Sequence, residues 1–216
     1  LLAKGLIGSG QVKNILLVTA ETYSKYLHPL DRSNRSIFGD AATATLISYS
    51  EEKDNIGNFL FGTDGAGYDK LIVKNGCSRF AYDTKAPEVT YGTGNIYSDN
   101  HLYMNGPDVF NFTNEVVPNF TKEIVESNNL EIDKIDQFVF HQANAYMLNF
   151  MRKRLKISND NFFIDLEDGG NTVSCTIPIA LKKYSKLINK ESTIIIVGFG
   201  VGLSWSGGLI KLNGEL

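Results

Sequence analysis

The chain has 216 residues, enough for one large domain or two small ones, and its 43% hydrophobic and 21% charged residues are those of an ordinary globular protein. Its net charge of −3 (21 − 24) excludes the broad basic surface that holds a nucleic-acid backbone. No apolar run approaches the roughly 20 residues that cross a bilayer. Two cysteines do not make a disulfide framework, so we expect a cytoplasmic protein. From the charge and the short apolar runs, we expect it to bind neither nucleic acid nor membrane.

The start of the chain has the pattern of a helix end. Apolar residues between positions 1 and 7 share one helical face, and Gly8 and Gly10 end the pattern. There is no initial Met and no basic leader, which excludes a signal peptide. We therefore expect a helix that is already under way at Leu1, in a chain truncated at its start.

The first half reads mainly as strands and loops. Apolar runs and glycine-rich breaks predict, in chain order, a buried strand at 13–19, a loop at 21–34, two strand halves within 36–50 around Gly39-Asp40, a charged turn at 51–55, strand signals within 58–74 and a long irregular loop at 77–100. The charged turn is the best boundary between halves, which gives domains at 1–50 and 51–216.

Helices and strands alternate in the second half. The patterns predict a helix at 106–129, a strand at 136–140, a helix at 144–155, a strand at 161–166, a helix at 172–187 and strands at 192–197 and 203–212. Pro118 should kink or break the first helix. This alternation predicts a layered α/β fold.

The most informative segment is Phe138-Val-Phe-His-Gln-Ala-Asn144. It places His141 at the carboxyl end of a predicted strand, where α/β sheets bind their ligands. A lone histidine is more often a core residue bonded to backbone. Gln142 and Asn144 crowd the same turn with polar groups, which favours a functional site.

Asn171 follows Gly169-Gly170 and precedes a predicted helix. On this motif alone, a helix N-cap and a functional residue are near even. Paired with His141, however, it could hold a carbonyl oxygen by two hydrogen bonds, which indicates acyl chemistry. Such chemistry needs a cysteine nucleophile. Cys175, at a helix start, reads as a small buried residue and Cys77 as incidental, so neither occupies the expected place.

Two further motifs have a functional and a structural reading. Gly198-Phe-Gly-Val-Gly202 follows a strand and could offer backbone N–H groups to an oxyanion, but it also suits a hairpin turn. Arg152-Lys-Arg154 could receive an acidic partner, although a solvated helix end is the default. His28 and His101 show no metal-ligand spacing, and we expect no metal site.

A series of segments resembles one family in order and spacing: Gly39-Asp-Ala-Ala42, Leu60-Phe-Gly-Thr-Asp-Gly65, Tyr103-Met-Asn-Gly106, Val109-Phe110, His141-Gln-Ala-Asn144, Gly170-Asn-Thr172 and Gly198-Phe-Gly-Val-Gly-Leu-Ser-Trp205. Together they resemble 3-oxoacyl-acyl-carrier-protein synthase III, the ketoacyl synthase III branch of the thiolase-like superfamily. The resemblance covers nearly the whole chain and implies a duplicated α/β fold of five layers.

The resemblance implies a Cys-His-Asn site in which His141 and Asn171 are the second and third members. The family's cysteine would lie about two helical turns before Leu1, at ~3.6 residues per turn, so the chain as given would lack it. The implied substrates are acyl-CoA and malonyl-acyl-carrier protein, without a cofactor. The implied reaction is a decarboxylative Claisen condensation in fatty acid biosynthesis.

In that reaction, His141 Nε2–H and Asn171 Nδ2–H would donate to the malonyl thioester oxygen. The backbone N–H of Val201, where the family often has glycine, would join that of the cysteine in an oxyanion hole. The resemblance also assigns a pantetheine tunnel and carrier-protein docking positions: Met104, Gly106, Phe110 and Asn144 for the tunnel, and Lys153 and Arg154 for docking. It further implies a homodimer, with 13–19 as the pairing strand.

Two alternatives remain open. Tyr146 stands where several family members have a docking arginine, which favours a related condensing enzyme of a secondary or surface-polymer pathway. A chain that truly started at Leu1 would favour a non-catalytic thiolase-like partner subunit.

Overall fold

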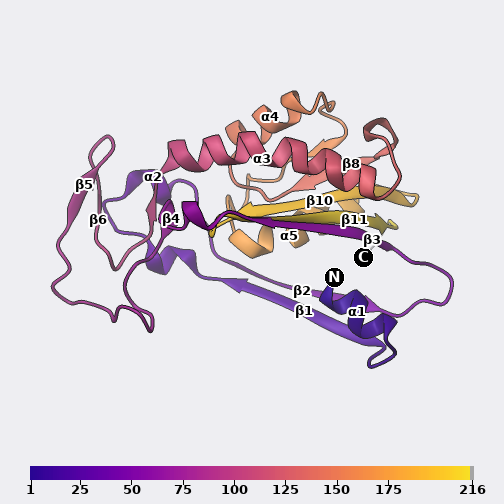
Figure 1. Cartoon of the computed structure of the whole chain (residues 1–216), viewed down its shortest axis with the longest axis horizontal. Helices are drawn as coiled ribbons and strands as arrows, with labels where there is room; N and C mark the ends of the chain where they lie inside the picture. Colours follow the sequence, from indigo (N-terminus) through magenta and orange to yellow (C-terminus); the bar gives the residue numbers. More distant parts are fainter. Residues whose placement is uncertain (215–216) are drawn as a thin grey trace.

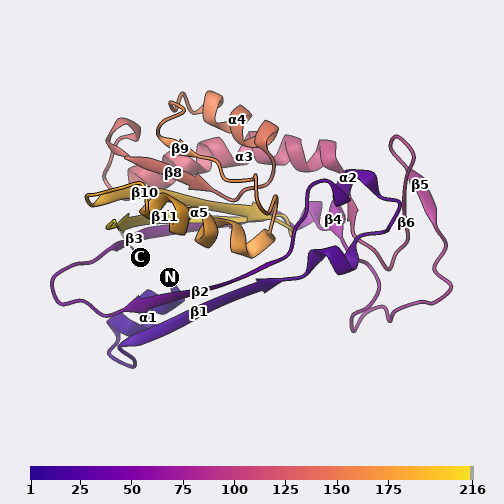
Figure 2. The ribbon, with the colours of Figure 1, turned by 180° about the vertical axis from the view of Figure 1, so that it is seen from behind.

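Layers of helices and sheets alternate in the structure, a computed structural model that describes residues 1–214. Helices α3 (Gly106–Ser127) and α4 (Ala145–Arg154) cover one face of the main sheet. Helix α5 (Thr176–Ser185) lies between that sheet and the pair β1 (Asn14–Glu21) and β2 (Ala41–Ser48), as Figures 1 and 2 show. The predicted layered α/β class is therefore confirmed.

The main sheet has five strands, in the order β3 (Ile56–Thr63), β11 (Ser204–Leu212), β10 (Ser192–Gly200), β8 (Gln137–Phe140) and β9 (Phe162–Phe163). Strands β8, β9 and β10 run parallel, whereas β11 is antiparallel to both of its neighbours. Because the carboxyl ends of parallel strands meet at one edge, His141 after β8 and Val201 after β10 lie at the same edge.

The core lies between the main sheet and helices α3 and α4. All four residues of β8 are buried, as expected for a parallel strand covered on both faces. Phe138 and Phe140 pack there against Leu148 and Met151 of α4. Burial of each such side chain contributes about 1.5–3 kcal/mol, so this packing fixes the strand end that carries His141.

Short elements complete the described chain: α1 (Leu2–Gly8), α2 (Arg32–Arg35), the pair β4 (Leu71–Ile72) and β7 (Tyr103–Met104), the hairpin β5 (Val89–Tyr91) and β6 (Asn95–Tyr97), and single turns of 3-10 helix at Tyr23–Tyr26, Gly65–Gly67, Ile132–Lys134 and Val173–Cys175. The expected irregular loop at 77–100 thus contains one hairpin. None of the helices described combines the length and apolarity needed to cross a membrane.

Helix α3 continues through Pro118, so a break there is wrong, and the alternative of a kink stays a prediction. The buried stripe of Val117, Phe120 and Ile124 packs against the core over the same turns. Tertiary packing of an apolar stripe outweighs the loss of one backbone hydrogen bond.

The segment 36–50 forms one strand and not two halves. Phe38 makes only an isolated bridge to Asn171, and β2 begins at Ala41. The residues before it form the short helix α2, whose N-cap Asp31 accepts a hydrogen bond from the Asn34 N–H. The predicted loop at 21–34 therefore ends in a helix.

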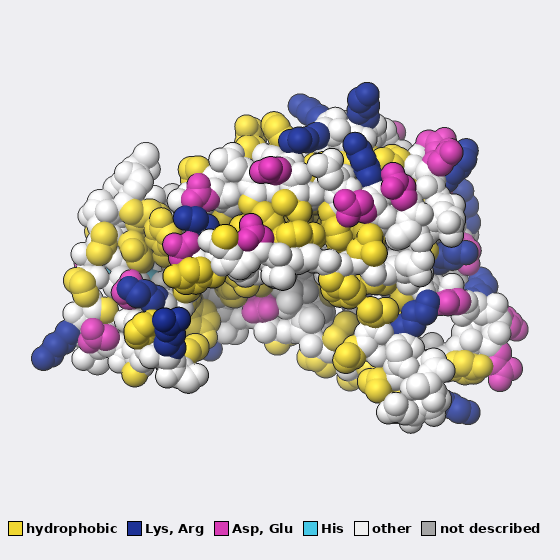
Figure 3. All heavy atoms as spheres, viewed as in Figure 1, with side chains coloured by type: hydrophobic (Ala, Val, Ile, Leu, Met, Phe, Trp, Pro, Cys, Tyr) yellow, Lys and Arg dark blue, Asp and Glu magenta, His cyan; other side chains and the backbone are white. Residues whose placement is uncertain are grey.

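Strand β1 was expected to be buried, and in the described chain that is wrong. Leu16 and Val18 are 62% and 60% exposed, because only one face of the β1–β2 pair packs against the turn before α5. Hydrophobic side chains also gather along the middle of the face drawn in Figure 3. The linker between β2 and β3 connects the two sheets, and the division into 1–50 and 51–216 stays a prediction.

Candidate functional site

A mostly apolar cavity of about 700 Å³ opens at the carboxyl edge of the main sheet. It collects residues from distant parts of the chain. The sequence-predicted site residues that line it are His141, Asn171, Val201, Met104, Gly106, Phe110 and Asn144. The structure therefore brings the expected catalytic pair and the expected tunnel residues to one cavity, and leaves Lys153 and Arg154 outside it.

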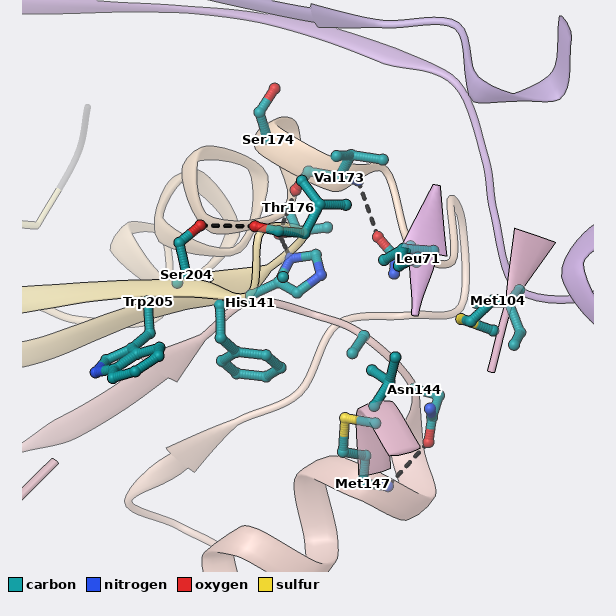
Figure 4. Close-up of a pocket in the computed structure, with 18 of the residues that line it drawn as sticks. Leu71, Met104, His141, Asn144, Met147, Val173, Ser174, Thr176, Ser204 and Trp205 are labelled. Atoms are coloured by element: carbon teal, nitrogen blue, oxygen red, sulfur yellow. Dashed lines mark hydrogen bonds between the residues drawn. The ribbon is translucent and has the colours of Figure 1, made fainter. Parts of the chain in front are cut away.

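His141 is fixed from both its backbone and its ring. Its backbone N–H donates to the Val197 carbonyl of β10 at 2.8 Å, which continues the parallel ladder by one residue. Its Nδ1 lies 2.8 Å from Thr176 Oγ1 at the start of α5, as Figure 4 shows. The Phe199 ring packs edge-on, with centroids 5.4 Å apart. These contacts hold one face of the imidazole toward the cavity.

Burial lowers the pKa of the His141 imidazole to about 4, and a hydrogen bond to the Val173 carbonyl opposes that effect in part. Desolvation penalises the charged form of a histidine, because the protein around the ring replaces water. His141 is therefore neutral at pH 7, with a single ring proton.

We expect the His141 imidazole to titrate near pH 4 in an NMR titration of the intact protein. The folded pKa lies below the ordinary value of 6.5, so the unfolded chain binds the proton first as pH falls. Stability is unaffected above pH 6.5 and falls between 6.5 and 4, by about 3 kcal/mol for this group. A midpoint near 6.5 would contradict this burial effect.

Asn171 is held by side chain and backbone together. Its Oδ1 accepts a hydrogen bond from the Val173 N–H at 2.9 Å, which leaves Nδ2 without a partner among residues 1–214. Its backbone N–H donates to the Ile37 carbonyl at 2.9 Å, and its carbonyl accepts from the Gly39 N–H at 3.0 Å. The N-cap reading fails, because α5 begins at Thr176 and the cap position of the preceding turn is Thr172.

Val173 links the two candidate catalytic residues. It has a φ of 55°, a left-handed conformation that β-branched residues rarely adopt. Its N–H holds the Asn171 side chain, and its carbonyl accepts from Thr176 Oγ1 at 2.9 Å. The backbone of Val173 therefore holds the side chains of both Asn171 and Thr176, two residues that line the cavity.

The polar neighbours of His141 have structural roles. Gln142 is 1% exposed and bonds only to backbone groups: it donates to the Phe140 carbonyl at 2.6 Å and accepts from the Asp165 N–H at 2.7 Å. Asn144 caps α4, because its Oδ1 accepts from the Met147 N–H at 2.9 Å. Of these two residues, only Asn144 also lines the cavity. The polar residues next to His141, which favoured a functional site, therefore serve mainly to stabilise the end of β8 and the start of α4.

Neither cysteine lines the cavity. Cys175 is fully buried, and its Sγ packs against the Thr19 and Ala41 carbonyls at 3.5 and 3.3 Å. Cys77 is an exposed thiol in the loop before β5. The reading of Cys175 as a small packing residue is therefore confirmed, and the described chain places no thiol beside His141.

Val201 lies in the turn that joins β10 to β11, so the predicted hairpin at 198–202 is confirmed. The Ser204 hydroxyl donates to the Val201 carbonyl at 2.7 Å and fixes this turn at the cavity wall.

Helix α4 carries an aromatic stack at its start and basic side chains in its last turn. Tyr146 is 71% exposed and stacks on Phe110, with ring centroids 5.4 Å apart and an angle of 27°. Lys153 and Arg154 are exposed near the end of the same helix and form no ion pair within the described residues.

Sequence reasoning missed Thr176, Val173 and Phe199 as parts of the site. Thr176 reads as an ordinary residue at a helix start, and no local pattern signals the left-handed φ of Val173. Phe199 lies in the glycine-rich segment, whose pattern points to backbone N–H groups and gives no sign of a role for the one aromatic side chain. A polar residue one turn into the helix after Asn171 was the one available signal.

Comparisons with known proteins agree with this arrangement. The protein-family model of 3-oxoacyl-[acyl-carrier-protein (ACP)] synthase III matches residues 1–65, and the family model of the C terminal part of that enzyme matches residues 125–212. The beta-ketoacyl-[acyl-carrier-protein] synthase III of Clostridium perfringens is 37% identical over 98% of this chain. The chain spans 63% of the length of the curated relatives from that organism.

Solved structures show the same likeness. A crystal structure of 3-oxoacyl-(acyl-carrier-protein) synthase III has a TM-score of 0.92 and 44% identity, and the match covers 97% of this chain and 63% of that chain. The priming beta-ketosynthase of a polyketide biosynthetic pathway has a TM-score of 0.85 and 27% identity, over 100% of this chain and 62% of that one.

Proposed function

The chain belongs to the 3-oxoacyl-[acyl-carrier-protein] synthase III family, and we propose that the protein carrying it catalyses a decarboxylative Claisen condensation in fatty acid biosynthesis. The acyl group comes from acyl-CoA and the extender from malonyl-acyl-carrier protein. One observation carries the proposal: His141 and Asn171 line one apolar cavity, each anchored by bonds that leave one polar side-chain atom free for a substrate.

In this proposal, Asn171 stabilises the charge that develops when malonyl loses CO₂. Its free Nδ2–H donates to the thioester oxygen, where the enolate charge gathers, and the Val173 N–H prevents the amide from turning. His141 Nε2 faces the same cavity. The Val201 N–H serves the earlier acyl transfer, together with a backbone N–H of the nucleophile.

The cavity wall suits a long thin thioester arm. Met104, Phe110 and Gly106 supply apolar or open surface along the cavity, and Asn144 adds one amide. We assign these residues to the pantetheine arm, because such pockets combine an apolar lining with few polar groups. Lys153 and Arg154 would then meet the acidic carrier protein beside the cavity.

The nucleophile is proposed to come from chain outside these 216 residues, as a cysteine near His141 in the complete protein. The edge of β1 away from β2 is the proposed homodimer contact, because pairing with the same strand of a second copy would continue the sheet and satisfy the open backbone groups of that edge. We place the reaction in the cytoplasm, since Cys77 and Cys175 are both free thiols in the described chain.

An assay of the complete protein tests the proposal. With labelled acyl-CoA we expect a protein thioester by intact mass, and malonyl-acyl-carrier protein should then yield CO₂ and a 3-oxoacyl product. The 216-residue chain alone should form neither, because its thiols lie away from the cavity. Stable acylation of Cys175 at a comparable rate would contradict the proposal, as would an inert complete protein that is folded and has a cysteine there.

A second candidate is a condensing enzyme that primes a specialised pathway. Tyr146 and the likeness to the priming beta-ketosynthase favour it. The two candidates differ in their carrier protein. Faster condensation with a carrier other than that of fatty acid synthesis would select the specialised pathway, whereas no condensation with any carrier would select a non-catalytic partner subunit.

A further inference from the structure

Lys183 on helix α5 binds two carboxylates of the segment that leads to Asn171. Its Nζ donates to Asp165 Oδ1 at 2.7 Å and to Asp168 Oδ2 at 2.6 Å. Asp165 is the buried partner, with 11% of its side chain exposed, whereas the Asp168 side chain is 83% exposed. Because water screens an exposed pair, the contact with Asp165 should carry most of the interaction.

The ion pair joins the two flanks of Asn171. Asp165 lies before Asn171, in the connection that leaves β9, and Lys183 lies after it, on the helix that follows the left-handed turn. Within the connection, the Gly170 N–H donates to the Leu166 carbonyl at 3.0 Å and closes one turn of backbone between Asp165 and Asn171. A shift of Asp165 therefore moves the backbone that carries the Asn171 side chain.

Asp165 also connects the flank of Asn171 with that of His141. Its backbone N–H donates to Gln142 Oε1 at 2.7 Å. Gln142 follows His141 directly in the chain, and its Nε2 donates to the Phe140 carbonyl at 2.6 Å. Asp165 thus bonds through its N–H to the strand end that carries His141, and through its carboxylate to the helix that follows Asn171.

The charge of Lys183 keeps the Asp165 carboxylate in its buried place. Hydrogen bonds to Asp165 and Asp168 raise the pKa of the Lys183 ammonium, so the lysine carries its charge throughout the neutral range. Asp165 has no cationic partner other than Lys183 within the described residues. A buried carboxylate that loses its only cation is costly, and the connection can relieve that cost by turning the carboxylate out to water.

We infer that Lys183 is a positioning residue that sets the Asn171 side chain relative to His141 by holding Asp165. Lys183 does not line the cavity, so it acts only through the connection that it holds. The functional meaning rests on the proposed function, in which Asn171 serves malonyl decarboxylation and backbone N–H groups serve acyl transfer. Loss of the ion pair should therefore affect the first half-reaction far more than the second.

Lys183→Met in the complete protein removes the charge and keeps most of the side-chain length. We expect malonyl decarboxylation to slow by about 10- to 10²-fold, because a misplacement of about 1 Å can cost 10²-fold, while acylation by acyl-CoA continues. Lys183→Arg keeps a cation for the carboxylates and should restore most of the rate. Lys182→Met is the matched control, since Lys182 is exposed on the same helix and forms no ion pair among residues 1–214. It should leave both half-reactions unchanged.

An equal loss of both half-reactions, or unchanged decarboxylation in a folded Lys183→Met protein, overturns the inference. Asp168→Asn should have little effect, because that contact lies in water, and a loss as large as that of Lys183→Met would overturn the assignment to Asp165. If Lys183→Met does not fold, the double variant Asp165→Asn/Lys183→Met removes the ion pair without leaving a buried charge. It should show the same selective loss.

Amide hydrogen exchange tests the ion pair without turnover. In Lys183→Met, the backbone N–H groups of Asn171 and Gly39 should exchange faster, because their hydrogen bonds join the loosened connection to residues 37–39. The amides of β10 should keep their protection. Unchanged exchange at Asn171 overturns the inference whatever the activity. If the complete protein proves inert, the proposed function fails, yet faster exchange at Asn171 would still support the positioning role of Lys183.

Discussion

Replacing Asn171 by alanine should abolish most malonyl decarboxylation while self-acylation of the complete protein continues. In the proposed mechanism, the Asn171 Nδ2–H donates to the thioester oxygen as enolate charge develops, and the Val173 N–H holds the Asn171 side chain by a hydrogen bond to Oδ1 at 2.9 Å. In the same proposal, acyl transfer to the nucleophile uses backbone N–H groups instead. Removal of one such preorganised donor typically costs about 10²–10³ in rate, so the condensation step should slow by that factor.

The two half-reactions are measured separately, by release of labelled CO₂ from malonyl-acyl-carrier protein and by intact mass after acyl-CoA. Asn119→Ala is a matched control, because Asn119 is an exposed asparagine on α3 and does not line the cavity. It should leave both rates unchanged. An equal loss of both half-reactions in Asn171→Ala would mean that Asn171 shapes the whole cavity and does not act on the enolate alone.

The elements that sequence reasoning found share a local cause. Strands β8 and β10 and helix α3 each carry an apolar pattern that is visible within one segment, and their ends were predicted within a few residues. His141 was found for the same reason, since a polar residue directly after an apolar strand lies at the sheet edge. Local patterns therefore predicted the layered fold and one residue of the candidate catalytic pair.

The errors share a non-local cause. Phe38 falls in the first of the two strand halves predicted within 36–50, yet in the structure it forms an isolated bridge to Asn171, far along the chain. Thr176 Oγ1 lies 2.8 Å from His141 Nδ1, and the residues beside Thr176 in the sequence give no sign of that contact. The burial of β1 was judged from its composition, although burial depends on what packs against each face. Such contacts exist only in the folded chain.

Replacing Gly39 by alanine should damage the site through the backbone, without touching a catalytic side chain. A Cβ on Gly39 would lie 2.1 Å from the Gly169 carbonyl oxygen, well inside van der Waals contact. Because that oxygen belongs to the backbone, no side-chain rotation can relieve the clash. The segments 37–39 and 169–171 must therefore move apart. This strains or breaks two backbone hydrogen bonds, from Gly39 N–H to the Asn171 carbonyl and from Asn171 N–H to the Ile37 carbonyl.

The loss should appear in both stability and rate. Overpacking of this kind typically costs about 1–3 kcal/mol, which a denaturant melt of the complete protein can measure. A displacement of Asn171 by about 1 Å can cost on the order of 10² in rate, so condensation should fall far more than the modest loss of stability explains. Gly65→Ala is the control, because a Cβ there meets nothing within 4 Å.

The pattern of effects separates two roles for the contact between 37–39 and 169–171. If Gly39→Ala destabilises the protein but leaves the rate per folded molecule intact, the bridge only joins the β2 segment to the main sheet. If it slows malonyl decarboxylation and spares self-acylation, as Asn171→Ala should, the bridge positions the Asn171 amide. We expect the second result, because both backbone bonds of Asn171 to this segment lie at the residue that carries the free Nδ2 donor.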